Sequence, residues 1–282
     1  MSEPLVYLNG AMTPIADAKV SVLDRGFIFG DGIYEVIPIY NRRMFRSEQH
    51  MARLFRSLAA IGLPNPHDQA GWMALIQQVV DGHPAPDQMV YLQVTRGVAR
   101  RVHAFPTEVV PTVFIMTNPI VLPSAALRAS GAACVSMQDM RWLHCEIKST
   151  SLLGNVLAAQ NAVEHDATES IQFRDGFLTE ASSSNVWIVH DGVLMGPPKD
   201  NLILEGIRYG LIEELCAAGD IPLQVRRITR EEVFAADEVM LTSATKEVLP
   251  VCSLDGQPIG NGKPGPIYNK LYAAYQVAKA QA

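Results

Sequence analysis

The stretch Arg141-Trp142-Leu143-His144-Cys145-Glu146-Ile147-Lys148-Ser149-Thr150 contains the only lysine between Lys19 and Lys199. A lysine in a half-apolar stretch is a candidate nucleophile, because partial burial favours the neutral amine over the charged ammonium. On local sequence alone, an ordinary surface lysine beside Glu146 is the more frequent alternative. The functional interpretation of Lys148 therefore depends on other groups in the chain.

A second candidate lies in the stretch Leu178-Thr179-Glu180-Ala181-Ser182-Ser183-Ser184-Asn185, where Glu180 precedes three serines. An acidic residue followed by hydroxyls suits the partner of a ring nitrogen beside an anion site. Pyridoxal phosphate requires one amine that bonds its aldehyde and one acid that keeps its pyridine nitrogen protonated. Lys148 and Glu180 together supply that pair, although for Glu180 taken singly a charged residue in a turn is the favoured alternative.

Composition and charge narrow the possible classes of protein. The 282 residues are long enough for two domains, and 48% hydrophobic with 18% charged residues indicates a packed globular chain. A formal net charge of -6 without a broad basic stripe argues against nucleic-acid binding. The four cysteines form no metal-site spacing, and reduced thiols are expected. Because the chain shows no signal-peptide pattern and no apolar run of about 20 residues, we expect a cytoplasmic protein.

Short strands and turns open the chain. We expect strands at residues 5–8, 33–40, 89–95 and 112–117. Asn9-Gly10 predicts a hairpin turn, and Pro38 places its strand at an edge or a bulge. Apolar residues spaced along one helical face predict a helix that Ser47 caps and Gly62 ends, and another around residues 72–80.

Two prolines frame residues 118–123, which we interpret as an interdomain linker. It separates a smaller N-terminal domain, residues 1–117, from a larger C-terminal domain, residues 124–282, which carries Lys148. In the second domain the patterns predict strands near 132–137, 171, 186–189 and 238–242, and helices over 151–165 and 206–218 and at the C-terminus. Strands clustered with helices, without a regular βαβ rhythm, predict an α+β fold.

Three places offer donors for a cofactor phosphate. Leu204-Glu205-Gly206-Ile207-Arg208 opens a helix, whose backbone N–H groups and dipole favour an anion. Thr242-Ser243-Ala244-Thr245 ends a strand with small and hydroxyl-bearing residues, and Arg53 could add charge-assisted bonds. Taken singly, each is weak evidence, because a helix start needs no phosphate and an arginine on a helix is usually a surface residue.

Arg101 and His103 are two residues apart, so in extended backbone their side chains point the same way. An arginine forms a two-pronged pair with a carboxylate, and an imidazole or a phenol adds a further donor. Tyr34, in the stretch Gly30-Asp31-Gly32-Ile33-Tyr34-Glu35-Val36, could be that phenol. These three residues are candidates for binding a substrate carboxylate. Without context, the alternative is that the basic pair Arg100-Arg101 faces water.

Four motifs span nearly the whole chain. They are Asp24-Arg25-Gly26 through Phe29-Gly30-Asp31-Gly32-Ile33-Tyr34-Glu35-Val36, Val94-Thr95-Arg96-Gly97 with Arg101 and His103, Arg141-Trp142 with Ile147-Lys148-Ser149, and Thr179-Glu180-Ala181-Ser182-Ser183-Ser184-Asn185-Val186. In this order the chain resembles the fold-type IV pyridoxal-phosphate aminotransferases. Within that family, the Arg-x-His pair with the tyrosine most resembles the D-amino-acid aminotransferases. The resemblance implies a two-domain α+β fold, pyridoxal 5'-phosphate as cofactor, and transamination between D-amino acids such as D-alanine and 2-oxo acids such as 2-oxoglutarate.

The resemblance also implies a role for each candidate. Lys148 would form the internal aldimine and act as the proton shuttle, and Glu180 would hold the pyridine nitrogen. The residues that would bind the phosphate are Arg53, Ile207, Arg208, Ser243, Ala244 and Thr245. Those that would bind the α-carboxylate are Tyr34, Arg101 and His103, with the last two contributed by the partner subunit of a homodimer.

Two departures from the family pattern concern the phosphate site. Related enzymes often carry threonine where this chain has Arg208 and where it has Ala244, so two hydroxyls are missing and backbone N–H groups would serve instead. Alternatives of the same fold type are a branched-chain L-amino-acid aminotransferase and a 4-amino-4-deoxychorismate lyase. A non-catalytic protein built on the same fold is the alternative of a different class.

Overall fold

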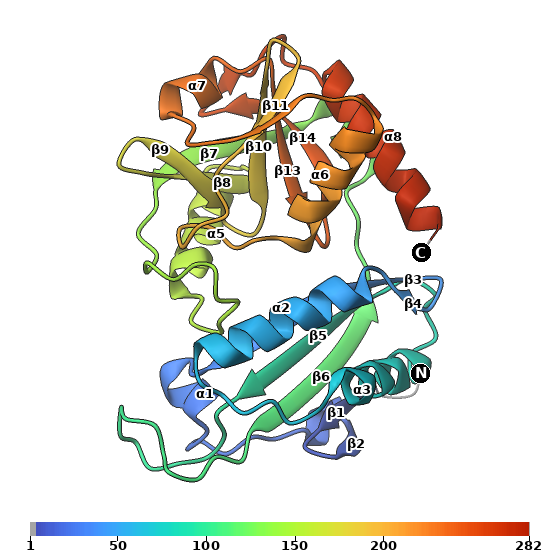
Figure 1. Cartoon of the computed structure of the whole chain (residues 1–282), viewed down its shortest axis with the longest axis vertical. Coiled ribbons are helices and arrows are strands. Elements are labelled where there is room, and N and C mark those ends of the chain that lie inside the picture. Colours follow the sequence, from blue (N-terminus) through green and yellow to red (C-terminus); the bar gives the residue numbers. More distant parts are fainter. Residues whose placement is uncertain (1–3, 282) are drawn as a thin grey trace. The chain divides into compact units, whose positions relative to one another are not determined.

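The computed structural model describes residues 4–281, which form two β-sheets and eight α-helices (Figure 1). These residues separate into two compact units. The first runs to Ile120 and takes in Ile147–Leu152, whereas the second comprises Val121–Glu146 and Leu153–Gln281. Lys148 thus belongs to the first unit, although the chain on either side of its segment belongs to the second. In this part of the chain, none of the helices combines the length and the apolar character of a membrane span.

The first unit is built on a six-stranded sheet in the order β2-β1-β6-β5-β3-β4. Its strands are β1 (Leu5–Leu8), β2 (Ala11–Pro14), β3 (Gly32–Tyr40), β4 (Arg43–Met44), β5 (Gln88–Thr95) and β6 (Thr112–Pro119). The predicted β1–β2 hairpin is confirmed, because Asn9 and Gly10 both have positive φ, as a two-residue turn of this kind requires. The Pro38 carbonyl accepts a hydrogen bond from the Phe45 N–H, so this residue turns its backbone polar side toward the short strand β4. Proline has no N–H to donate on that side, and β4 pairs with only two residues of β3 there.

Two helices, α2 (Ser47–Ala60) and α3 (Gln69–Asp81), cover one face of this sheet (Figure 1). Their apolar sides, with Leu54 and Ile76, pack against Ile37 of β3 in one buried cluster. A short helix, α1 (Arg25–Phe29), precedes β3. The start of α2 corrects our expectation: Arg46, in a left-handed conformation, occupies the N-cap, and Ser47 is the first helical residue.

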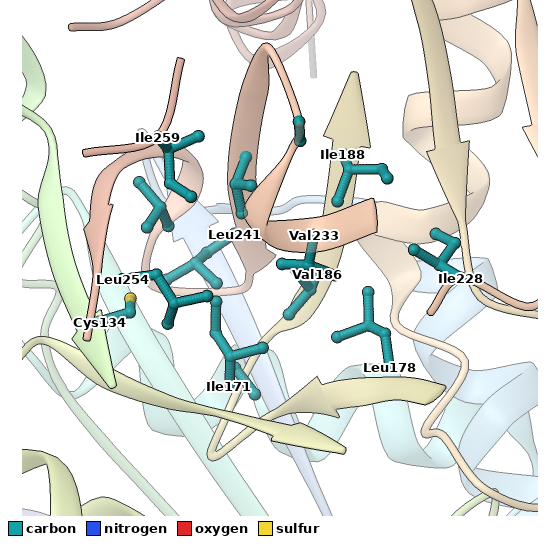
Figure 2. Close-up of a cluster of buried hydrophobic side chains, with 14 of the residues drawn as sticks. Cys134, Ile171, Leu178, Val186, Ile188, Ile228, Val233, Leu241, Leu254 and Ile259 are labelled. Carbon is teal, nitrogen blue, oxygen red and sulfur yellow. The ribbon is translucent and has the colours of Figure 1, made fainter. Parts of the chain in front are cut away.

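The second unit contains a nine-stranded mixed sheet in the order β12-β11-β10-β13-β14-β7-β8-β9, with β15 beside β14. Its strands are β7 (Ala132–Gln138), β8 (Glu169–Arg174), β9 (Phe177–Ala181), β10 (Asn185–His190), β11 (Val193–Gly196), β12 (Leu223–Val225), β13 (Glu238–Ser243), β14 (Glu247–Leu254) and β15 (Gln257–Pro258). Its helices are α4 (Ala125–Ser130), α5 (Leu153–Glu164), α6 (Ile207–Ala218), α7 (Arg230–Phe234) and α8 (Pro266–Ala280). Figure 2 shows its core, where Ile171, Leu178, Val186 and Leu241 from four strands meet.

The chain leaves the first sheet later than the proline pattern suggests. Asn118 and Pro119, which we expected in the 118–123 linker, are the last residues of β6 and pair with Met89 and Gln88 of β5. The pairing extends to Pro119 because β5 runs antiparallel to β6 and its first residue, Gln88, lies opposite Pro119. The domain boundaries at 117 and 124 remain a prediction.

The helix expected over residues 151–165 begins at Leu153 and presents an apolar surface. Four of its apolar side chains are each more than half exposed: Leu153, Val156, Leu157 and Val163. We call these four residues the α5 apolar surface. A grouped exposure of this kind is typical of a contact surface with another molecule.

Candidate active site

Lys148 lies beside β3 in the first unit. Its carbonyl accepts a hydrogen bond from the Tyr34 N–H at 2.9 Å, and its own N–H donates to Ser57 Oγ on α2 at 3.3 Å. With the backbone held in this way, Lys148 Nζ lies 4.1 Å from the centroid of the Tyr34 ring. The structure therefore brings the candidate amine and the candidate phenol together.

The run from Gly30 to Gly32 allows this approach. The Thr150 N–H donates to the Gly32 carbonyl at 2.9 Å, and Thr150 Oγ1 donates to the Gly30 carbonyl at 2.9 Å. A Cβ on Gly32 would lie 2.7 Å from the Val94 carbonyl oxygen, closer than such atoms approach in proteins. Only glycine therefore lets the segment that carries Lys148 and the neighbouring strand β5 both pack against the start of β3.

Arg53 is buried, and its guanidinium is bonded to Glu35. Its Nε and Nη2 donate to the two carboxylate oxygens at 2.7 and 2.8 Å, and His50 Nδ1 lies 2.8 Å from Oε2. Burial raises the pKa of Glu35, but Arg53 and His50 outweigh it and hold that pKa well below its usual range. Because Tyr34 and Glu35 are adjacent on β3, their side chains leave opposite faces of the sheet. Arg53 and Tyr34 are thus separated by the sheet.

Arg101 and His103 are exposed and share one aromatic neighbour. The Arg101 guanidinium carbon and the centroid of the His103 ring lie 5.6 and 5.4 Å from the centroid of the Phe29 ring. Within residues 4–281, neither side chain forms a hydrogen bond or ring contact with Tyr34. The first unit therefore holds two pairs of candidates, Lys148 with Tyr34 and Arg101 with His103.

Glu180 is a buried carboxylate of the second unit. Its Oε1 accepts from Arg141 Nη1, and its Oε2 accepts from the Leu204 N–H at 3.1 Å and from Asn185 Nδ2 at 3.3 Å. Burial raises the pKa of Glu180 to about 6, because desolvation outweighs the charge and hydrogen bond of Arg141, which lower it. A further cationic partner, such as a protonated ring nitrogen, would favour the ionised carboxylate.

Sequence reasoning assigned no role to Arg141 and missed Asp139 altogether. Asp139 accepts from Arg141 Nε and Nη2 at 3.0 and 2.8 Å, and from Thr179 Oγ1 at 2.9 Å. Burial raises the pKa of Asp139, but the hydrogen bonds and charge of Arg141 lower it to about 2. The ionised Asp139 thereby orients Arg141 toward Glu180. The presence of Arg141 in the same motif as Lys148 was the one available signal for this arrangement.

The start of α6 and the end of β13 lie at the same end of the second sheet. Asn185 pairs with Thr242 in the β10–β13 ladder, and its Nδ2 donates to the Leu204 carbonyl at 2.8 Å. Gly206 is the N-cap of α6, and among the described residues no side chain caps this helix before Ile207. A Cβ on Gly206 would collide with Asn185 Oδ1. With a larger residue at 206, either Asn185 or the helix start would have to shift. The first-turn N–H groups of the helix are suited to an anion.

The other residues predicted to bind the phosphate lie in two different settings, a turn after β13 and a buried position on α6. Ser243 ends β13, and Ala244 and Thr245 form the turn that follows, which a 3.1 Å hydrogen bond from the Lys246 N–H to Ser243 Oγ closes. Arg208 is buried, with its Nε 3.2 Å from Tyr275 Oη on α8. The Arg208 guanidinium is therefore directed toward α8, and the backbone of this residue is the part that belongs to the helix start.

The three serines after Glu180 have a different role from the one we expected. The hydroxyls of Ser182, Ser183 and Ser184 all donate to Glu169, at 2.7, 2.9 and 2.6 Å. Lys246 Nζ also forms an ion pair with Glu169 at 2.5 Å. The interpretation of this cluster as an anion site is wrong, because its donors are taken by a buried carboxylate of β8.

The sequence matches a known protein family over most of its length. The model of the family Amino-transferase class IV matches residues 32–254. The chain belongs to the class IV aminotransferases. Members of this family are transaminases that depend on pyridoxal 5'-phosphate, so the predicted class of enzyme and its cofactor are both confirmed.

Two curated relatives of this class IV aminotransferase match it over nearly their full length. The D-alanine aminotransferase of Bacillus licheniformis is 41% identical over 271 residues, which cover 96% of this chain and 95% of the relative. The D-alanine aminotransferase of Staphylococcus aureus is 41% identical over 272 residues, which cover 96% of each chain.

Solved structures of class IV enzymes share the fold. A branched-chain amino acid aminotransferase of Escherichia coli superimposes with a TM-score of 0.92 at 24% identity, over 98% of this chain and 94% of that chain. The branched-chain aminotransferase of Thermoproteus uzoniensis superimposes with a TM-score of 0.89 at 27% identity and the same coverage. The predicted α+β architecture of fold type IV is confirmed.

Proposed function

We propose that this class IV aminotransferase acts on D-amino acids and transfers the amino group from donors such as D-alanine to 2-oxo acids such as 2-oxoglutarate. The observation that carries the proposal is the pairing of Arg101 with His103 beside Phe29, which offers a carboxylate two adjacent donors. The two D-alanine aminotransferases at 41% identity support it. We further propose a cytoplasmic location, in keeping with four buried, unpaired cysteine thiols.

Each of the two units holds residues that suit one part of the cofactor. Lys148 offers an amine for its aldehyde, and Glu180 offers a carboxyl for its pyridine nitrogen. The start of α6, where Gly206 leaves no space for a Cβ, offers backbone donors for its phosphate. Ile207 and Arg208 at this helix start, and Ser243, Ala244 and Thr245 at the turn after β13, would hold the phosphate. Arg53, two of whose nitrogens bond Glu35, would add its charge. When bound, the cofactor supplies the electron sink that weakens the bonds at the substrate α-carbon.

The side chains of this protein then move and hold protons. Lys148 Nζ removes the proton from the α-carbon of the substrate as a base and returns a proton as an acid. Tyr34 keeps its ring against that amine and so limits where Nζ can deliver the proton. The ionised Glu180 would keep a proton on the pyridine nitrogen, and Arg141 orients the Glu180 carboxylate.

Selection of the D-enantiomer follows from holding two groups of the substrate at once. Arg101, His103 and Tyr34 would bind the α-carboxylate, and the amino group would be held separately at the cofactor. With both fixed, only one enantiomer presents its α-hydrogen to Lys148 Nζ, and the mirror image turns that hydrogen away. A transferred proton needs a donor and an acceptor within hydrogen-bond reach, so the other enantiomer reacts slowly.

A homodimer would complete this site, with Arg101 and His103 of one subunit serving the Lys148 and Tyr34 of the other. Two features support this proposal. Within a single chain, Arg101 and His103 contact Phe29 and not Tyr34. The α5 apolar surface is also exposed, as a subunit interface would be in the isolated chain.

Steady-state transamination with matched enantiomers tests the proposal. With 2-oxoglutarate as acceptor, we expect kcat/KM for D-alanine to exceed that for L-alanine and L-leucine by at least about a hundredfold. Lys148→Ala should lower kcat by about a thousandfold or more, because the proton shuttle is lost. A preference for L-leucine would reject the D-specific function and favour the branched-chain alternative, whose solved structures share the fold.

A further inference from the structure

A buried arginine holds the loop that carries Arg101 and His103. Arg25 of α1 is 3% exposed, and its Nη1 donates to the Val102 carbonyl at 2.6 Å while its Nη2 donates to the His103 carbonyl at 3.1 Å. The Ala104 carbonyl lies 3.4 Å from Nη1. One guanidinium thus accounts for three successive carbonyl groups, in a loop that forms no helix or strand.

Asp31 holds this guanidinium from the other side. Its carboxylate accepts from Arg25 Nε at 2.7 Å and from Arg96 Nε at 2.9 Å. Arg96 in turn donates to the carbonyls of Ile61 and Gly62 at the end of α2, and its guanidinium carbon lies 3.6 Å from the centroid of the Phe105 ring. Arg25 therefore holds the loop by hydrogen bonds to residues 102–104, and Arg96 contacts it at Phe105. The Asp31 carboxylate accepts hydrogen bonds from both arginines.

Phe29 contacts both Arg25 and the two candidate side chains of the loop, Arg101 and His103. Its ring centroid lies 4.8 Å from the Arg25 guanidinium carbon, 5.6 Å from that of Arg101 and 5.4 Å from the centroid of the His103 ring. Phe29 lies four residues after Arg25 in α1, so the two side chains stand on the same face of this short helix. The backbone of the loop and the two side chains it presents are thus fixed by neighbouring residues of one short helix.

We propose that Arg25, braced by Asp31, is a positioning residue that sets the geometry of Arg101 and His103 for the substrate carboxylate. The inference rests on the proposed function, in which these two residues bind that carboxylate. A two-pronged carboxylate pair depends on the direction of its donors, and a displacement of about 1 Å far from the reacting atoms can cost on the order of a hundredfold in rate. A loop of exposed residues needs such a brace to hold its side chains in place.

Arg25→Lys separates charge from geometry, because a lysine keeps the positive charge but has one nitrogen and cannot serve Asp31 and three carbonyls together. Arg100→Gln is the matched control, since it removes a positive charge from the exposed neighbour of Arg101 and leaves the Arg25 bonds intact. Both holoenzymes would be assayed with D-alanine, and hydrogen–deuterium exchange would be followed for the peptide spanning residues 98–106. Phe29→Leu removes the shared ring while keeping every Arg25 bond, which provides a second variant if Arg25→Lys does not fold.

In Arg25→Lys we expect amide exchange over residues 102–105 to rise by about tenfold and KM for D-alanine to rise by about tenfold, with kcat within about twofold. Arg100→Gln should change neither quantity by more than about twofold. Phe29→Leu should raise KM without raising the exchange of residues 102–105. In the Arg101→Ala and His103→Ala background, Arg25→Lys should add little further to KM, because groups that act through one another are not additive.

Unchanged exchange in Arg25→Lys would overturn the inference, and so would faster exchange with an unchanged KM. A full additional rise of KM in the background without Arg101 and His103 would also overturn it, since Arg25 would then act by another route. If Arg101→Ala alone leaves KM for D-alanine unchanged, the proposed carboxylate site fails instead. If instead Arg101→Ala raises KM for D-alanine and Arg25→Lys does not, only the role of Arg25 is rejected and the carboxylate site stands.

Discussion

Arg141, in the second unit, affects the pKa and the orientation of the candidate acid Glu180. It forms hydrogen bonds with two carboxylates at once, Glu180 and Asp139, and the two respond in opposite ways. Burial raises the pKa of both carboxyl groups: at Glu180 it prevails and the pKa rises to about 6, whereas at Asp139 the hydrogen bonds and charge of Arg141 together outweigh burial and lower the pKa to about 2. Asp139, ionised at neutral pH, thus fixes the position of Arg141, and the ionisation of Glu180 is free to respond to a cation bound beside it.

Arg141→Gln should raise the pKa of Glu180 further above 6, because the charge that lowers it is removed. The ionised carboxylate is the form that pairs with a protonated ring nitrogen. The affinity of the cofactor-free protein for pyridoxamine 5'-phosphate should therefore rise with pH through a midpoint near 6, and in the variant this midpoint should move to higher pH. Arg174→Gln is the control, since Arg174 contacts Asp139 and not Glu180. A midpoint that is the same in all three proteins would contradict the prediction.

Asp139→Asn should remove a pH-dependent contribution to stability. The pKa of this buried carboxyl is lowered from an ordinary value of 3.8 to about 2. Such a group contributes about 2 kcal/mol above pH 4, and the contribution is lost as pH falls from about 4 toward 2. Urea unfolding of wild type and variant should therefore show a difference in unfolding free energy that is constant above pH 5 and narrows below pH 4. A difference independent of pH down to 3 would exclude this role for the ionised carboxylate.

At the scale of elements, the position of α6 depends on one glycine. Gly206 has ordinary extended backbone angles, so its role is steric and not conformational. Because Asn185 occupies the space where a Cβ would stand and also bonds the Leu204 carbonyl, the helix start is docked directly onto the end of β10. This docking places the first-turn N–H groups near the end of β13, where the predicted phosphate turn begins.

Gly206→Ala should lower cofactor affinity, because the collision with Asn185 Oδ1 displaces either the helix start or the Asn185 side chain that bonds Glu180 and Leu204. We expect the dissociation constant of pyridoxal 5'-phosphate, measured by absorbance titration of the cofactor-free protein, to rise by at least about tenfold, equivalent to about 1.4 kcal/mol. Gly210→Ala is the matched control. A Cβ at Gly210, inside the same helix, meets no atom within 4 Å, so alanine should leave affinity unchanged and stabilise the helix by up to about 1 kcal/mol. Equal affinities of the two variants would contradict the role of the Gly206 contact.

At the scale of the whole molecule, the α5 apolar surface is the feature that a single chain leaves unexplained. Its side chains occupy the positions by which the helix was predicted from sequence, and yet they are exposed. Apolar periodicity predicts that a helix has a face to bury, but it does not say whether the same chain or another one covers that face. A second copy of the chain is the partner that our proposed function requires.

Val156→Asp should separate the subunits, because a charge at the centre of an apolar interface loses its hydration without a partner, at a cost of about 2 kcal/mol or more. Light scattering during size-exclusion chromatography should show a dimer for wild type and a shift toward monomer for the variant. D-alanine transamination should fall in parallel, since Arg101 and His103 then no longer reach the partner's site. Val277→Asp is the control, as the same substitution at an exposed apolar position of α8. Dimers of unchanged stability in Val156→Asp would show that α5 lies outside the interface.

The sequence alone determined the kind of chemistry and the cofactor, because the four motifs around Tyr34, Arg101, Lys148 and Glu180 occur in the order that the fold-type IV family shows. Residue identities and their order along the chain can be read without coordinates, although each of these residues taken singly was weak evidence. Local patterns likewise sufficed for the Asn9-Gly10 hairpin and most helices, since these depend on near neighbours in the chain. Packing alone decided the partners across long separations: Lys148 beside Tyr34, Arg141 on Glu180, and the serines of 182–184 on Glu169. Such contacts arise from how two sheets fold, and no spacing along the chain encodes them directly.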